Sequence, residues 1–186
     1  MKSFRLANLA TGIAIVAFML PACRLAAQNA DSPAVSKLLE AVKSHAALAD
    51  EDAHTLASYT RSDIGWQTHG KQLTLIKEHV NDLISDSNQL NAMRDEGSPW
   101  QQEAIDRIGT LLPEMASNLT STIDHLNDNK NRTSLKPYRD LAKANETVIH
   151  KAHEIIADFV DYSQAKAKSE TLEKQLQLPA ASESGS

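Results

Sequence analysis

The sequence contains few cysteine, glycine, proline and aromatic residues, and each shortage excludes a kind of site, fold or core. One cysteine among 186 residues excludes an internal disulfide and any metal site that needs a pair of cysteines. Six glycines and six prolines are too few for a β-sandwich or a low-complexity chain. Because aromatic residues make up only 4% of the chain, the core must be built from Leu, Ile, Val and Ala.

Basic residues are also in deficit. Lys and Arg number 19 and Asp and Glu 24, so the formal charge is −5, whereas nucleic-acid-binding domains usually carry a basic excess. We therefore expect no nucleic-acid partner. Without residues 1–27, which hold three basic and no acidic residues, 16 basic and 24 acidic residues remain and the charge is −8. Such a charge favours solubility and disfavours binding to anionic lipid.

The first 27 residues have the layout of a bacterial secretory signal. Lys2 and Arg5 make a short basic start, residues 6–20 are uncharged and mostly apolar, and small residues follow Pro21. The apolar stretch of about fifteen residues is shorter than the ~20 that a membrane-spanning helix needs. The sequence therefore predicts a signal peptide over residues 1–27 and an exported, periplasmic protein.

Two interpretations of this segment stay open. Leu25-Ala26-Ala27 suits a signal peptidase, which would leave Gln28 as the new N-terminus. Leu20-Pro21-Ala22-Cys23 instead resembles a lipobox, although proline is uncommon there. In that case residues 1–22 are a lipoprotein signal, Cys23 is acylated, and the protein is held at the membrane. Only this second interpretation predicts membrane attachment.

Four amphipathic segments follow, over about residues 32–60, 63–96, 99–127 and 137–176. In each, apolar residues recur every three or four positions, which indicates helices with one apolar stripe. The predicted stripes are Val35, Leu39, Val42, Ala46, Ala49, Ala53 and Leu56; Trp66, His69, Leu73, Ile76, Val80, Leu83, Ser87 and Leu90; Ala104, Ile108, Leu111, Leu112, Met115, Leu119, Ile123 and Leu126; and Leu141, Val148, Ala152, Ile155, Phe159 and Tyr162, widened by Ile149, Ile156 and Val160.

These segments predict an all-α fold, an elongated antiparallel (up-down-up-down) four-helix bundle after an N-terminal signal segment. The bundle domain spans residues 28–178, and residues 179–186 are expected to be a disordered C-terminal tail. The fourth helix should extend beyond the others from about Lys166. No strand or hairpin-turn signal is present.

Local signals mark the helix ends. Ser32 before Pro33 predicts an N-cap and a first helical turn. Gly97 fits the left-handed position after a helix, and Ser98 with Gln101 fits a capping box, so one helix should end and the next begin within about two residues. Pro113 predicts a kink or a short break near residues 109–113.

Motifs that carry chemistry are missing from the sequence. There is no haem-attachment motif, no Gly-rich phosphate loop, no His-Glu-x-x-His and no Gly-x-Ser-x-Gly. A di-iron bundle needs two Glu-x-x-His pairs, and only Glu51 with His54 has that spacing. We therefore expect no enzyme and no cofactor. The sequence favours a non-enzymatic partner-binding or scaffolding module of the cell envelope.

The alternative is a periplasmic protein that binds a metal or a small ligand. In an up-down bundle His54, His69 and His125 belong to one pole, and imidazoles with nearby carboxylates can bind Zn²⁺ or Cu²⁺. Only His69 lies on a predicted stripe, where a buried structural histidine is the simpler interpretation.

Aromatic residues are expected at both poles, with Tyr59, Trp66 and Tyr138 at the histidine-bearing one. Trp100, Phe159 and Tyr162 belong to the other. Beyond them, Leu172 and Leu176 lie one turn apart among charged residues near the end of the fourth helix. These leucines predict either a solvated helix end or self-association or binding of a protein partner through this part of the chain.

Overall fold

The computed structural model describes residues 30–177, and every regular element in that range is helical. The helices are α2 (Pro33–Tyr59), α3 (Trp66–Ala92), α4 (Pro99–Asp128) and α5 (Lys136–Leu176), with a short 3₁₀ turn, η1 (Arg94–Glu96), before α4. The predicted signal segment, the lipidation residue Cys23 and the predicted tail over residues 179–186 lie outside the described residues.

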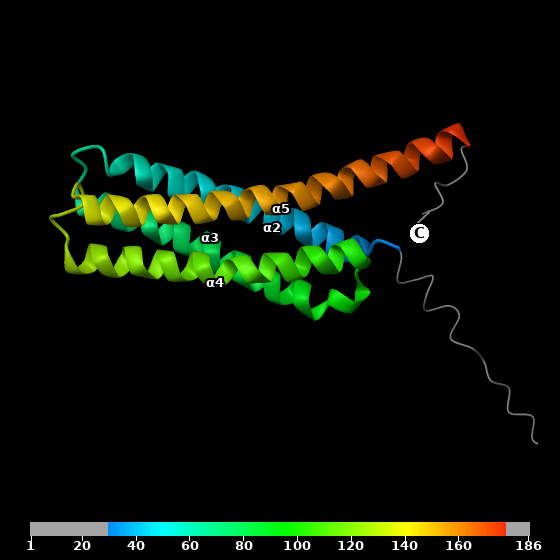
Figure 1. The fold of residues 1–186 in the computed structure, drawn as a ribbon, viewed down its shortest axis with the longest axis horizontal. Helices are drawn as coiled ribbons and strands as arrows, with labels where there is room; N and C mark the ends of the chain where they lie inside the picture. The colour runs from blue at the N-terminus through cyan, green and yellow to red at the C-terminus, as the bar shows by residue number, and fades with distance from the viewer. Residues whose placement is uncertain (1–29, 178–186) are drawn as a thin grey trace, which may run out of the picture.

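The four helices form the predicted antiparallel bundle (Figure 1). Each helix packs mainly against two neighbours, in the ring α2–α3–α4–α5 and back to α2. The bundle is elongated, because a helix of 27 residues such as α2 is about 40 Å long at 1.5 Å per residue. None of the helices within residues 30–177 is long and apolar enough to cross a membrane.

The predicted stripes of α2 and α3 form the core. All seven stripe residues of α2 are buried, and the α3 stripe is buried from His69 to Leu90, with Trp66 packed at its edge. The α4 stripe is largely right as well, except that Leu111 and Ile123 are only partly buried. Alanine dominates the second half of the α2 stripe, so neighbouring helices can approach closely there.

The predicted stripe of α5 is right in part, but its centre is misplaced. The buried residues are Tyr138, Ala142, Asn145, Ile149, Ala152, Ile156 and Val160. Of the main predicted stripe only Ala152 is buried. Ile149, Ile156 and Val160, which were predicted to widen the stripe, form its centre. Ile155 and Phe159 therefore lie at the edge of the core, and Tyr162 is 52% exposed.

The connection before α4 differs from the prediction. α3 ends at Ala92, and η1 separates it from α4, so the link is longer than two residues. Gly97 has φ −79° and ψ 149°, an extended conformation rather than the left-handed one. A Cβ at this position would lie 3.1 Å from Gln101 Cβ and 3.3 Å from the Arg94 carbonyl oxygen, so close packing favours glycine here.

The predictions for the starts of α2 and α4 are confirmed. Ser32 caps α2 through a 3.4 Å hydrogen bond from Val35 N–H to Ser32 Oγ, and Pro33 occupies the first turn. Ser98 N–H donates to Gln101 Oε1 at 3.0 Å, which is the returning arm of the predicted capping box. Of the kink or short break predicted near Pro113, the break is absent, since α4 runs through this residue without interruption.

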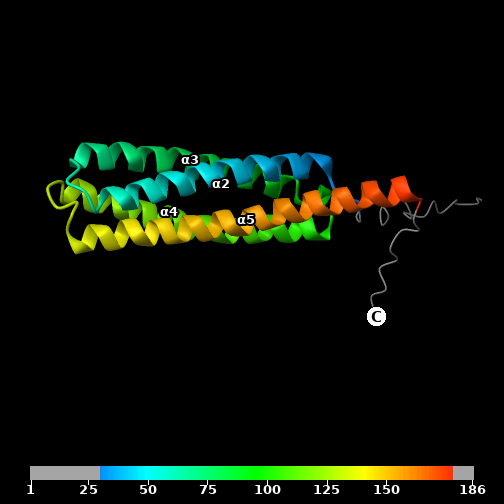
Figure 2. The same cartoon turned by 90° about the horizontal axis from the view of Figure 1, so that it is seen from above.

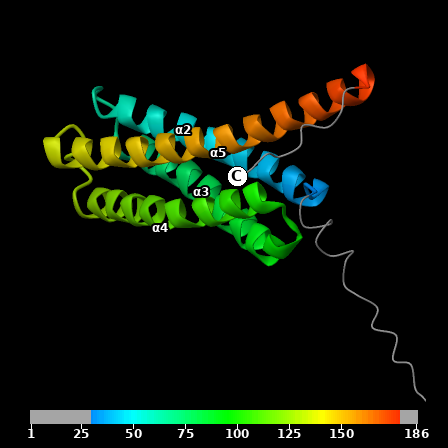
Figure 3. The same cartoon turned by 45° about the vertical axis from the view of Figure 1, so that its right-hand side comes forward.

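α5 is the longest helix, with 41 residues, and it continues past the start of α2 and α4 (Figures 1 and 2). Figure 3 shows the same projecting end, drawn in orange to red, with no other helix beside it. The projection begins slightly later than predicted, since Lys166 Nζ still reaches Asp31 Oδ1 at 2.9 Å. We call residues 168–176 the α5 extension.

Candidate functional site

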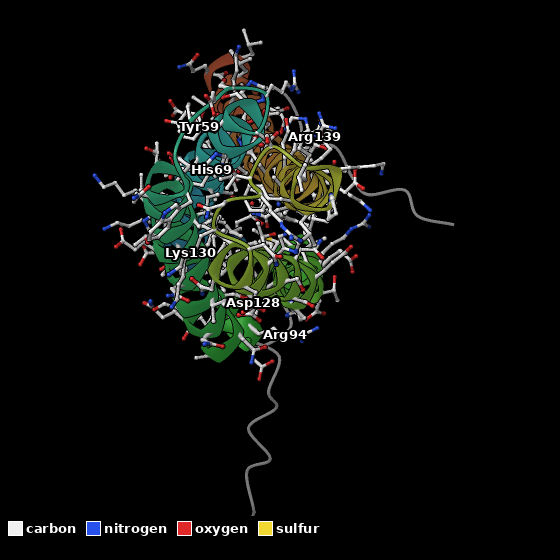
Figure 4. The ribbon with its side chains drawn as sticks, turned by 90° about the vertical axis from the view of Figure 1, so that its left-hand side faces the viewer. Tyr59, His69, Arg94, Asp128, Lys130 and Arg139 are labelled. Atoms are coloured by element: carbon white, nitrogen blue, oxygen red, sulfur yellow. The ribbon has the colours of Figure 1, made fainter. Side chains whose placement is uncertain are left out.

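The histidine pole is the end of the bundle where α2 and α4 end and α3 and α5 begin. Figure 4 views this pole along the bundle, with Tyr59 and His69 labelled. His69 is fully buried, and its ring meets Tyr59 and Tyr138 edge-on at 5.9 Å and 5.3 Å between centroids. His125 stacks on the other side of this cluster, 6.0 Å from the Tyr138 ring. Four of the residues predicted at this pole, Tyr59, His69, His125 and Tyr138, are therefore joined by ring contacts.

His69 has the character of a core residue with one unmet hydrogen bond. Tyr138 Oη lies 3.3 Å from His69 Nδ1, while Nε2 has no hydrogen-bond partner. Burial lowers the pKa of His69 below its usual 6.5, because it penalises the charged ring. The Ile64 carbonyl acts to raise this pKa, but its effect is smaller than that of burial. It does not form a hydrogen bond with Nε2. A neutral imidazole packed between tyrosines is the result.

His54 lies apart from this cluster, on the outer face between α2 and α5. Its side chain is 77% exposed, and its Nδ1 lies 3.1 Å from Glu146 Oε1. Burial alone would raise the pKa of Glu146, but hydrogen bonds from Lys143 and His54 hold that pKa below its usual value. The structure thus brings His69 and His125 to Tyr138 and pairs His54 with a carboxylate elsewhere.

Sequence reasoning missed a second histidine cluster, formed by α5 and the middle of α2. His150 Nδ1 and His153 Nδ1 each lie 3.0 Å from Asp50 Oδ2. The hydrogen bond to Asp50, followed by the charge of Asp50, raises the pKa of His150. The His150-x-x-His153 spacing was visible in the sequence, but the facing carboxylate becomes apparent only once α2 and α5 are packed together.

The contacts of this second cluster are hydrogen bonds between two imidazoles and one carboxylate. Asp50 Oδ2 lies within hydrogen-bonding distance of both Nδ1 atoms, and a carboxylate oxygen can accept from both. Within residues 30–177, no group of three or more His, Cys, Asp or Glu side chains is arranged to hold a metal ion. The metal site predicted at His54, His69 and His125 gains no support from this geometry.

A groove of about 490 Å³ lies beside Gly109 and Pro113, between α3 and α4. Asp106 is the one charged residue among those lining it, and Arg94 binds this carboxylate with two hydrogen bonds of 2.7 Å. The hydrogen bond from Arg94 also lowers the pKa of Asp106. The charge that a ligand could use here is thus already neutralised.

The opposite end, which we call the cap pole, holds a more suitable site. A groove of about 370 Å³ between α4 and α5 is lined by Trp100, Arg107, Ile155, Asp158, Phe159 and Tyr162, and we call it the aromatic groove. Trp100 and Tyr162 meet edge-on at 5.3 Å between ring centroids. Four of the six lining residues are apolar or aromatic, and the other two are an Arg and an Asp. Such a surface can receive an apolar side chain of another protein.

Asp31 fixes the walls of this groove. Its Oδ1 accepts hydrogen bonds from Trp100 Nε1 at 2.6 Å, from Ser98 Oγ at 2.7 Å and from Lys166 Nζ at 2.9 Å. Partial burial would raise the pKa of Asp31, but the hydrogen bonds from Ser98, Lys166 and Trp100 lower it overall. Asp31 thereby joins the start of α2, the start of α4 and the last anchored turn of α5.

The fold and this groove define an all-α bundle with an aromatic surface site. Comparison with known proteins adds no name to this description: no family model matches the chain, and neither a curated protein nor a solved structure shows significant similarity to it. Function must therefore be argued from the chain itself.

Proposed function

We propose that this protein is a non-enzymatic module of the bacterial cell envelope that binds a protein partner through the exposed face of α5. Export rests on the signal-like layout of residues 1–27. The single observation that carries the binding role is that α5 continues past the bundle with its leucines uncovered, next to the aromatic groove. Leu172 is 45% and Leu176 64% exposed.

The aromatic groove and the α5 extension share one helix. Ile155, Phe159 and Tyr162 of the groove and Leu172 and Leu176 of the extension all belong to α5. Trp and Tyr are enriched where proteins bind one another, because each buries a large area at low cost in conformational entropy. Exposed large apolar side chains gathered on one helix are typical of an interaction site.

Site-specific photo-crosslinking in the native cell tests the binding role. A photoreactive amino acid replaces Tyr162, Leu172 or, as a control, Leu75, which is exposed to 42% on α3. Adducts of defined size from Tyr162 and Leu172 and none from Leu75 are expected. Equal labelling from all three positions, or no adduct at all, would contradict the proposal.

Export is tested separately by mass spectrometry of the protein from its own envelope. A mature chain that begins at Gln28, or a diacylglyceryl group on Cys23, supports export and distinguishes the two signal interpretations. A chain that keeps Met1 in the cytoplasmic fraction would contradict it.

A further inference from the structure

The exposed face of α5 has the spacing of a coiled-coil seam. Tyr162, Ala165, Ser169, Leu172 and Leu176 follow one another at intervals of three, four, three and four residues. All five are exposed. This is the heptad spacing that holds two helices together, and its last three residues lie where α5 has left its neighbours in the bundle.

We propose that α5 of a second copy of this chain occupies this seam, in antiparallel orientation. The inference rests on the proposed function, since it names the partner of the same surface. The contact is isologous: about a twofold axis, the two α5 helices present the same residues to each other in reverse order.

The sizes of the seam residues favour the antiparallel arrangement. In this register Ser169 lies opposite Leu172 of the second copy, and Ala165 lies opposite Leu176 of the second copy. The twofold axis generates each of these two layers a second time. Each of these layers pairs a small residue with a leucine, so the side chains interdigitate. A parallel pair in register would place Ala against Ala and Ser against Ser and would leave gaps in those layers.

Charges beside the seam agree with this register. Lys166 and Glu173 flank the seam on the same side of α5. In the antiparallel register, Lys166 of each copy lies opposite Glu173 of the other copy. Lys166 already binds Asp31, but an ammonium group has three donors and can also reach a second carboxylate. The two symmetric pairs would therefore attract in both halves of the contact.

Net charge disfavours the parallel alternative as well. The chain carries −5, or −8 without residues 1–27, and a parallel pair would hold two acidic bundles side by side. The antiparallel pair places the two bundles at opposite ends of the contact. Because the contact covers only about three helical turns, over residues 165–176, it belongs to the small and weak class of interfaces.

Sedimentation equilibrium of the mature chain from about 10 µM to 1 mM tests the pairing. We expect a reversible monomer–dimer equilibrium that Leu172→Glu with Leu176→Glu weakens at least tenfold and Glu173→Lys weakens more modestly. Leu75→Glu is the matched control, since it places the same charge on an exposed leucine of α3 and should change nothing. Circular dichroism confirms that each variant remains helical.

Small-angle X-ray scattering tests the orientation. Two α5 helices of about 60 Å that overlap over residues 165–176 give an antiparallel particle roughly 105 Å long, whereas a parallel pair is little longer than one copy. A monomer at 1 mM, a dimer insensitive to the leucine variants, or a short dimer would each overturn the inference. If the protein is monomeric while Leu172 crosslinks to a different protein in the cell, self-pairing fails and the proposed function stands.

Discussion

Gln101 shows how one buried polar side chain organises the cap pole. Its Oε1 accepts from Ser32 N–H at 2.8 Å and from Ser98 N–H at 3.0 Å, so it serves the first residues before α2 and before α4. Its Nε2 donates to the Ser32 carbonyl and to Ser36 Oγ, both at 3.0 Å. Free N–H groups at helix starts need acceptors, and here one fully buried residue supplies two helices.

Gln101→Leu should therefore destabilise the bundle by about 2–4 kcal/mol. The change keeps the approximate volume but leaves the two N–H groups without an acceptor, each at a cost of about 1–3 kcal/mol when buried. Urea unfolding followed by circular dichroism measures the effect. Gln89→Leu, on the exposed face of α3, is the control and should stay within about 0.5 kcal/mol. Equal stability of the two variants would disprove the capping role.

His69 and Tyr138 form a buried pair, so the free-energy costs of replacing them should not be additive. Tyr138→Phe leaves His69 Nδ1 unpaired, and His69→Leu leaves Tyr138 Oη unpaired, so each should cost about 1–2 kcal/mol. The double variant should cost less than the sum by about 1 kcal/mol, because no unpaired partner remains. Thermal or urea unfolding of all four proteins gives the coupling, and strict additivity would argue against the hydrogen bond.

The same pair should govern stability in mild acid. Because the pKa of His69 is below 6.5 in the folded state, the unfolded chain binds a proton first, and stability falls as pH decreases below about 6.5. The raised pKa of His150 acts in the opposite sense: its stabilising contribution is complete below about 6.5 and is lost at higher pH. Unfolding at pH 7.5 and 5.5 should show a smaller acid loss for His69→Leu with Tyr138→Phe and a larger one for His150→Gln. The reverse ordering would refute this assignment.

Several of these residues escaped sequence reasoning for one physical reason. A stripe is recognised from its apolar residues, so the sequence indicated Gln101 only as part of a local capping box. Its hydrogen bonds to Ser32, 69 positions away, form only when the helices pack together. Asn145 is fully buried in α5, and neither its Nδ2 nor its Oδ1 has a hydrogen-bond partner. No periodicity argument places a polar side chain there, although Asn145 lies on the buried stripe of α5.

At the scale of the helices, α5 shows where periodicity succeeds and fails. The extent of the helix was predicted well, since its ends follow from proline and the apolar repeat. Its buried face was not, because α5 carries apolar residues over a wide arc, and only contact with α2 and α4 decides which of them enter the core. The surplus residues Ile155, Phe159 and Tyr162 are those that make the aromatic groove.

α4 carries two residues that weaken a helix, at Gly109 and Pro113. Pro113 cannot donate a backbone hydrogen bond to the Gly109 carbonyl, and its side chain is exposed. A Cβ added at Gly109 would meet no atom within 4 Å. Both positions therefore accept alanine without a clash.

Gly109→Ala should stabilise the bundle by about 0.5–1 kcal/mol, and Pro113→Ala by about 1–3 kcal/mol. Differential scanning calorimetry should show a higher melting temperature for each variant and the highest for the double one. Glu114→Ala, an exposed change on the same helix, serves as the control. A loss of stability in either variant would mean that the groove between α3 and α4 depends on the native residue.

At the scale of the whole molecule, stability and the proposed function occupy different parts of the chain. The core ends on α5 at Val160, and the last ion pair of α5 with another part of the described chain is that of Lys166 with Asp31. The surface that we assign to binding begins at the edge of this core and continues along the α5 extension. A helix end held by no other element is consistent with a segment whose stable contacts come from a partner.

Truncation of α5 should therefore separate the stability of the bundle from the proposed binding function. A chain that ends at Ala167 keeps Lys166 and should unfold with the same free energy as the full mature chain, to within about 0.5 kcal/mol, because the removed residues bury nothing in the bundle. A chain that ends at Ala165 also loses the ion pair with Asp31 and should be less stable by about 1 kcal/mol, since charged hydrogen bonds contribute about 1.5–3 kcal/mol and Lys166 is partly exposed to solvent. Urea unfolding at a dilution where the protein is monomeric measures both. A large loss on cutting after Ala167 would show that the α5 extension belongs to the folded core and not to an interaction surface.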